Sequence, residues 1–79
     1  MRLDRKAILS PCQTQWLDQV FSARAVAKGG VVRRAVRDTE RMVGRAILAS
    51  EVRRCGFHMV ECGGQFIVIC NDGEVQIVV

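Results

Sequence analysis

The sequence of 79 residues is about half apolar (49%) and carries 12 basic against 8 acidic side chains, for a net charge of +4 at pH 7. This length and composition are typical of one folded domain over residues 1–79, and they exclude a disordered chain. The longest apolar run is Phe66–Cys70, which is too short for a membrane-spanning helix. A domain this small buries only about 60% of the surface that its unfolded chain exposes, so self-association would add stability.

The N-terminal segment, MRLDRKAILSPC, has basic residues but only a short apolar stretch before Pro11. We therefore expect no secretory signal peptide and a cytoplasmic location. Cysteines in that compartment are reduced thiols rather than disulfides. The expected thiols are Cys12, Cys55, Cys62 and Cys70.

A first helix is predicted from about Pro11 to Lys28. Ser10 can cap its start, Pro11 suits the first helical position, and Gln13 completes a capping box. Gly29-Gly30 then provides the cap and turn that end it. The apolar side chains recur at spacings of three and four, as an amphipathic helix requires. They are Trp16, Leu17, Val20, Phe21 and Ala27.

A second amphipathic helix is predicted over Val31–Arg54, ended by Gly56. Its apolar face comprises Val32, Ala35, Val36, Val43, Ala46 and Ile47. Its opposite face gathers four arginines within about 80°. We call Arg34, Arg37, Arg41 and Arg45 the arginine stripe. In the alternative interpretation, Val31–Val36 forms a strand and Asp38 or Thr39 caps a shorter helix, which the β-branched residues allow.

Three short strands are predicted after the second helix. They are Phe57–Cys62, Gln65–Cys70 and Glu74–Val79, separated by Gly63-Gly64 and by Asn71-Asp72-Gly73, both typical hairpin turns. The expected fold is therefore α+β, with two helices followed by a three-stranded antiparallel meander (ααβββ), or βαβββ in the alternative interpretation.

Strand alternation predicts which side chains share a sheet face, if both turns have two residues. One face suits the helices and carries Phe57, Met59, Phe66, Val68, Cys70, Val75, Ile77 and Val79. The other carries His58, Val60, Cys62, Gln65, Ile67, Ile69, Glu74, Gln76 and Val78. This second face is too apolar to lie in water, so we expect it to contact a partner or a second copy of the chain. The predicted interface residues are Val60, Ile67, Ile69 and Val78.

The sequence indicates no catalytic residue, metal site or cofactor, and no small-molecule substrate. The Cys55-x2-His58-x3-Cys62-x7-Cys70 spacing matches no familiar zinc motif. In the two-residue turn model His58 and Cys62 also point away from Cys70, whereas a three-residue turn would bring His58 and Cys70 together. A Cys nucleophile activated by His58 would also need an orienting group and an oxyanion site. The sequence indicates neither, so we do not expect an enzyme.

The arginine stripe is the second candidate interaction site. The middle of the chain, residues 24–54, has nine basic and three acidic side chains. Residues 55–79 have no basic and three acidic side chains. Arg34 to Arg45 would span about 16 Å of helix, enough to contact several phosphates of a nucleic acid. No aromatic side chain stands among the arginines to stack on bases. Local pairs such as Asp38 with Arg41 and Glu40 with Arg37 would instead make it a solvated face.

The runs GGVVRRAVRDTERMVGR and RRCGFHMVECGGQFIVICN resemble a group of short bacterial proteins of uncharacterised function, over roughly residues 16–71. Some members of that group carry the name phosphoribosylanthranilate isomerase, which implies a (β/α)₈ barrel enzyme. Such a barrel takes about 200 residues or more, so the resemblance transfers neither that fold nor a catalytic residue.

From the sequence we therefore expect a small non-enzymatic interaction or assembly protein that self-associates, as a homodimer or higher homo-oligomer, through an apolar sheet face. The alternative is a nucleic-acid-binding regulator that uses the arginine stripe.

Overall fold

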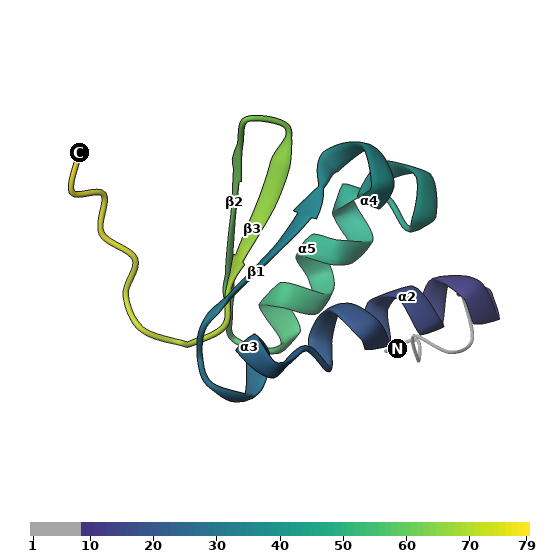
Figure 1. Cartoon of the computed structure of the whole chain (residues 1–79), viewed down its shortest axis with the longest axis horizontal. Helices are drawn as coiled ribbons and strands as arrows, with labels where there is room; N and C mark the ends of the chain where they lie inside the picture. Colours follow the sequence, from purple (N-terminus) through teal and green to yellow (C-terminus); the bar gives the residue numbers. More distant parts are fainter. Residues whose placement is uncertain (1–8) are drawn as a thin grey trace, which may run out of the picture.

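The computed structural model describes residues 9–79 and forms an α+β fold with a three-stranded antiparallel sheet (Figure 1). This fold class is confirmed. The expectation that the N-terminal segment is no signal peptide concerns mainly residues 1–8, which lie outside the described residues. The elements in chain order are α2 (Pro11–Phe21), α3 (Arg24–Ala27), β1 (Val31–Ala35), α4 (Val36–Met42), α5 (Arg45–Arg54), β2 (His58–Cys62) and β3 (Gln65–Ile69).

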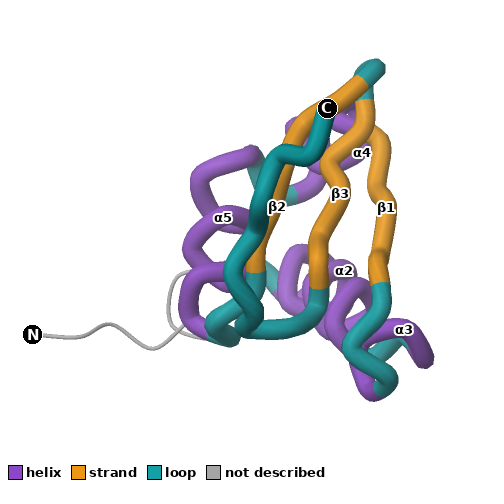
Figure 2. Tube along the Cα trace, turned by 90° about the vertical axis from the view of Figure 1, so that its left-hand side faces the viewer, coloured by secondary structure: helices purple, strands orange, loops and turns teal. Residues whose placement is uncertain are grey.

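The sheet has the strand order β1-β3-β2, with β3 at the centre. The helices of residues 9–79 lie together on one side of this sheet, and none of them covers the other side (Figures 1 and 2). Within residues 9–79, no helix combines the length and apolar character that a membrane span needs. The sheet thus has an inner face, packed on helices, and an outer face.

The inner face and the helices enclose one apolar core. Phe66 and Val68 of β3 are 2% and 1% exposed, and Leu48 of α5 and Leu17 of α2 are completely buried. Thr39 is also buried, and its hydroxyl donates to the Ala35 carbonyl at 3.0 Å, which satisfies the polar group inside the core. The core is continuous from α2 to the sheet.

The predicted β2–β3 hairpin is confirmed with its register. Cys62 pairs with Gln65 and Val60 with Ile67, as a two-residue turn at Gly63-Gly64 requires. Both glycines have positive φ, 58° and 76°, which is the conformation of the tight turn that matches the twist of a hairpin. As predicted, Phe66 and Val68 point to the helices and Ile67 to the opposite face.

The prediction that residues 31–54 form one helix is wrong at its beginning. Val31–Ala35 is strand β1, as in the alternative interpretation, and it pairs antiparallel with β3, Val32 opposite Val68. Ladder pairing and the burial of Val32 (5% exposed) outweigh the local helical periodicity. Neither Asp38 nor Thr39 caps α4, which begins at Val36 without a side-chain cap.

The same predicted helix is broken a second time at Gly44. This residue has φ +85° and ψ 153°, a backbone conformation open to glycine alone among ordinary residues. Its N–H donates to the Thr39 carbonyl at 2.7 Å and closes α4. The chain thereby changes direction, and α5 lies along the sheet with Leu48 and Val52 in the core.

The first helix is shorter than predicted. The capping box is confirmed: Gln13 N–H donates to Ser10 Oγ at 3.2 Å, and Ser10 N–H to Gln13 Oε1 at 2.9 Å. However, α2 ends at Phe21, and Ala23 is extended (ψ 148°) before the single turn of α3. This bend brings α3 against the start of β1, where Gly30 N–H donates to the Ala25 carbonyl at 2.7 Å.

The predicted third strand of the meander, Glu74–Val79, is not formed. The reason is the topology: β3 is the central strand, and β1 and β2 occupy both of its sides. The segment therefore leaves the sheet as an extended tail (Figure 1). Val75, Ile77 and Val79, which we placed on the inner face, are 39%, 82% and 115% exposed.

Candidate interaction surface

The outer face of the sheet carries a row of aliphatic side chains from all three strands. Cross-strand pairing places Val31 and His58 on either side of Ile69, and Arg33 and Val60 on either side of Ile67. Val31 and Val60, at the two sides, are 51% and 39% exposed. The central pair, Ile67 and Ile69, is half-buried between these neighbours. We call Val31, Val60, Ile67 and Ile69 the outer apolar row.

Three of the four predicted interface residues, Val60, Ile67 and Ile69, lie in this row. Val31 joins them, which the single-helix prediction missed because it placed this residue outside the sheet. Val78, the fourth predicted residue, lies in the tail and is 91% exposed, so its placement on the sheet face is wrong. The tail starts beside the outer face, where His58 Nε2 and the Gly73 carbonyl share a hydrogen bond of 2.5 Å.

The arginine stripe is divided among three elements. Arg34 belongs to β1, Arg37 and Arg41 to α4, and Arg45 to α5, so they do not form one helical face. Arg34 Nη1 donates to the Arg33 carbonyl at 2.7 Å, and Arg41 pairs with Asp38 at 3.4 Å, as predicted. The geometric basis for a continuous phosphate-binding stripe is therefore absent, while the ability of these residues to bind an anion stays a prediction.

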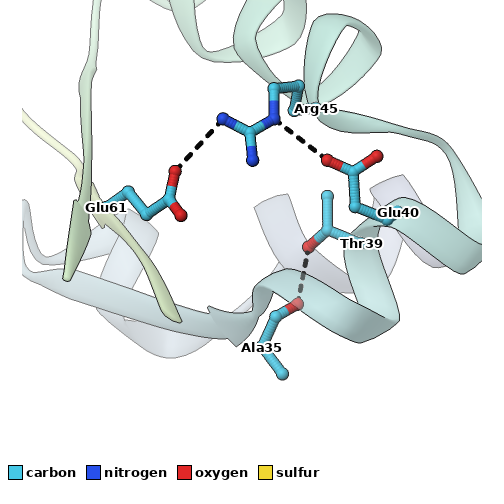
Figure 3. Close-up of polar contacts among 5 residues, drawn as sticks. All are labelled: Ala35, Thr39, Glu40, Arg45 and Glu61. Atoms are coloured by element: carbon cyan, nitrogen blue, oxygen red, sulfur yellow. Dashed lines mark hydrogen bonds and ion pairs between the residues drawn. The ribbon is translucent and has the colours of Figure 1, made fainter. Parts of the chain in front are cut away.

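Arg45 lies between two carboxylates from different elements (Figure 3). Its Nε contacts Glu40 at 3.0 Å and its Nη1 contacts Glu61 at 3.1 Å. The hydrogen bond to Glu40 and the charge of Glu61 raise the pKa of the guanidinium further. The group also lies over the Phe66 ring, 5.3 Å from the centroid. Arg45 thus connects α4, α5 and β2, and two acidic neighbours offset its charge.

A groove of about 380 Å³ lies between α5 and β2. Its lining is mostly apolar and comprises Arg45, Ala46, Ala49, Met59, Val60, Glu61 and Phe66. The two alanines leave space because a larger residue on this side of α5 would fill it. Sequence reasoning missed the groove, since Ala46 had been placed on the buried face of a longer helix.

The cysteines and histidine do not assemble into a site. Among the described residues, no group of three or more His, Cys, Asp or Glu side chains could hold a metal ion. Cys12 and Cys62 are exposed, whereas Cys70 is buried, and its burial raises the pKa of the thiol. Cys70 Sγ instead contacts the Val68 carbonyl at 3.7 Å inside the core.

Over the part of the chain that the structure describes, the outer apolar row and the groove are therefore the surfaces best suited to a ligand or partner. Comparisons with protein-family models, with curated proteins and with solved structures find no match to this chain.

Proposed function

We propose that this protein is a small assembly module that acts by binding rather than by catalysis, and that two copies associate through their outer apolar rows. The supporting observation is the exposure of Val31 (51%) and Val60 (39%) on either side of Ile67 and Ile69. Each Å² of such surface removed from water contributes roughly 25 cal/mol. We place this association in the cytoplasm, where free cysteines persist.

A symmetric homodimer fits this surface. In a two-fold contact each copy presents the same patch, so the patch must complement itself. The outer apolar row does so, because aliphatic side chains from β1, β3 and β2 cross the sheet without an acidic residue among them. Arg33 and His58 lie beside the row and can stay in water at its rim.

Sedimentation velocity on the full chain tests this function. We expect the native protein to sediment as a dimer at the upper end of the micromolar range and Ile67→Lys to sediment as a monomer, because a charge in the centre of the row would be buried unpaired. Val31→Lys, at an exposed position of β1, gives the same test with less risk to folding. Ser50→Lys, which adds the same charge on the exposed side of α5, should leave the dimer intact.

A native protein that stays monomeric throughout would overturn the proposal. Affinity capture with and without nuclease covers the alternative function. If retention on nucleic acid at low salt depends on Arg37 and Arg41, the arginine stripe carries the function; if the recovered complex survives nuclease, protein assembly carries it.

A further inference from the structure

The two edges of the sheet differ in what they offer to another strand. At β1, hydrogen bonds from Cys70 N–H to the Gly30 carbonyl and from Val36 N–H to the Gly64 carbonyl set the pairing with β3. By alternation, Arg33 and Ala35 direct their backbone groups outward. Both of those carbonyls already accept side-chain hydrogen bonds, from Arg34 Nη1 at 2.7 Å and from Thr39 Oγ1 at 3.0 Å. Two arginines also make this edge basic, which opposes strand addition.

Among the described residues, neither side-chain hydrogen bonds to the backbone nor basic side chains protect the β2 edge in this way. The pairing of Val60 with Ile67 uses the backbone groups that face β3, so alternation directs those of Met59 and Glu61 to the open side. Strand β2, HMVEC, contains no lysine or arginine. The groove lies along this edge, with Ala46 and Ala49 of α5 as one wall and Met59 as the other. An open strand edge beside an apolar groove is the arrangement that accepts an extended peptide.

The tail of the chain has the properties of such a peptide. The segment EVQIVV, Glu74–Val79, alternates apolar side chains at Val75, Ile77 and Val79, yet it belongs to no strand. Ile77 and Val78 are 82% and 91% exposed. Six extended residues span about 20 Å, which is enough to cover a five-residue strand of about 17 Å.

We infer that the tail of a second copy adds as a strand to the edge of β2 and inserts alternate side chains into the groove between α5 and β2. This inference rests on the proposed self-association and names the segment that crosses between copies. Pairing would use the open backbone groups of Met59 and Glu61. Ile77, at the centre of the alternation, would pack on Ala46 and Ala49.

A second copy fits this role better than the chain's own tail. Within one copy, the tail begins at Gly73 beside the first residue of β2 and runs in the same direction as β2 along the outer side of the sheet (Figure 2). It lies on the side opposite the helices, whereas the groove is bounded by α5 (Figure 1). A copy related by a two-fold axis perpendicular to the strands brings its tail antiparallel to β2 and exchanges tails reciprocally, so that each groove is filled once.

Charge also favours this pairing of surfaces. The tail and the turn before it, residues 71–79, carry Asp72 and Glu74 and no basic side chain. Helix α5, RAILASEVRR, carries three arginines against one glutamate; Glu40 and Glu61 offset the charge of Arg45, so the basic end of the helix is at Arg53 and Arg54. Opposite charges on the two segments would steer the acidic tail toward the α5 side of the groove.

Matched substitutions on both surfaces test the inference by sedimentation of the full chain. We expect Ala49→Trp, which fills the groove, and Ile77→Asp, which charges the inserted side chain, each to raise the dimer dissociation constant about 100-fold or more. Ser50→Trp, at an exposed position of α5 that does not line the groove, and Gln76→Asp, whose side chain alternates with that of Ile77, should change it by less than about threefold. Ala46→Trp, at an exposed position, fills the same groove if Ala49→Trp does not fold.

Isotope-filtered NMR on an equal mixture of labelled and unlabelled protein shows which copy supplies the tail. We expect nuclear Overhauser contacts between the Ile77 methyls of one copy and the Ala49 methyl of the other. Contacts confined to one copy, or no contacts, would overturn the inference. A native dimer that Ala49→Trp and Ile77→Asp leave intact also overturns it but leaves the proposed function standing, whereas a native monomer overturns both.

Discussion

The inner and outer faces of the sheet are built from alternate residues of the same strands, yet they have opposite environments. On the inner face Val32, Phe66 and Val68 are 5%, 2% and 1% exposed. On the outer face Val31, the direct neighbour of Val32, is 51% exposed, and Val60 is 39% exposed. Aliphatic residues thus serve two purposes in one sheet: those of the inner face hold the helices, and those of the outer face are left for a partner.

The largest predicted effect lies at the centre of the inner face. Replacing Phe66 by alanine leaves a cavity under Arg45 and between the sheet and α5. We expect Phe66→Ala to lower the free energy of unfolding by about 3–5 kcal/mol, which for a domain of this size approaches its whole stability. Urea unfolding followed by circular dichroism measures it. A loss below about 1 kcal/mol would contradict the assignment of Phe66 to the core.

A matched pair of valines compares the faces directly. Val32→Ala on the inner face should cost about 2 kcal/mol of unfolding free energy, because two buried methyl groups are lost and a cavity remains. Val31→Ala on the outer face should cost no more than about 0.5 kcal/mol in the dissociated chain. Both values come from urea unfolding at a concentration where the native protein is monomeric. Equal losses would mean that the two faces do not differ.

The turn at Gly44 allows α5 to pack on the inner face, and its backbone conformation predicts a smaller effect. A Cβ at this position meets no atom within 4 Å, so only the strain at φ +85° opposes a side chain. We expect Gly44→Ala to lower the free energy of unfolding by about 1–2 kcal/mol. Ser50→Ala, at an exposed position of α5, serves as the control and should change it little. A neutral Gly44→Ala would show that the turn can relax.

Thiol reactivity extends the comparison of buried and exposed sites without changing the fold. Burial raises the pKa of Cys70 and also shields its thiol from reagents, whereas Cys12 and Cys62 are exposed. We expect alkylation near pH 8 to modify Cys12 and Cys62 well before Cys70, as mass spectrometry of digested protein reads out. Because the folded state holds the Cys70 proton more tightly, stability should decrease slightly as the pH rises above the ordinary thiol pKa of 9.0. Early modification of Cys70 would contradict its burial.

Local signals were sufficient to predict the β2–β3 hairpin. Gly63-Gly64 fixes a two-residue turn, and the turn fixes the parity of every side chain in both strands. The inner and outer placement of Phe66, Ile67 and Val60 followed from that parity. The capping box of Ser10 and Gln13 was readable for the same reason, since its partners lie three residues apart.

The errors concern features that distant segments decide. The run VVRRAVR fits both a helical and an extended period, and its pairing with β3, 30 to 38 residues away, selects the strand. That pairing also displaces Glu74–Val79 from the sheet. The groove was not predictable, because it forms only where α5 and β2 come together. Glu61, one partner of Arg45, was missed for the same reason, whereas the contact with Glu40, five residues before Arg45, depends on the unexpected turn at Gly44.

A dilution series followed by methyl NMR tests the central claim, that the outer face is the surface buried between copies. We predict that the methyl signals of Val31, Val60, Ile67 and Ile69 shift together as the protein is diluted, while those of Val32 and Val68 on the inner face do not move. Both sets come from the same three strands, so the inner methyls are an internal control. Outer-face signals that stay constant from millimolar to low micromolar concentration, in a protein that sediments as a monomer, would contradict the account.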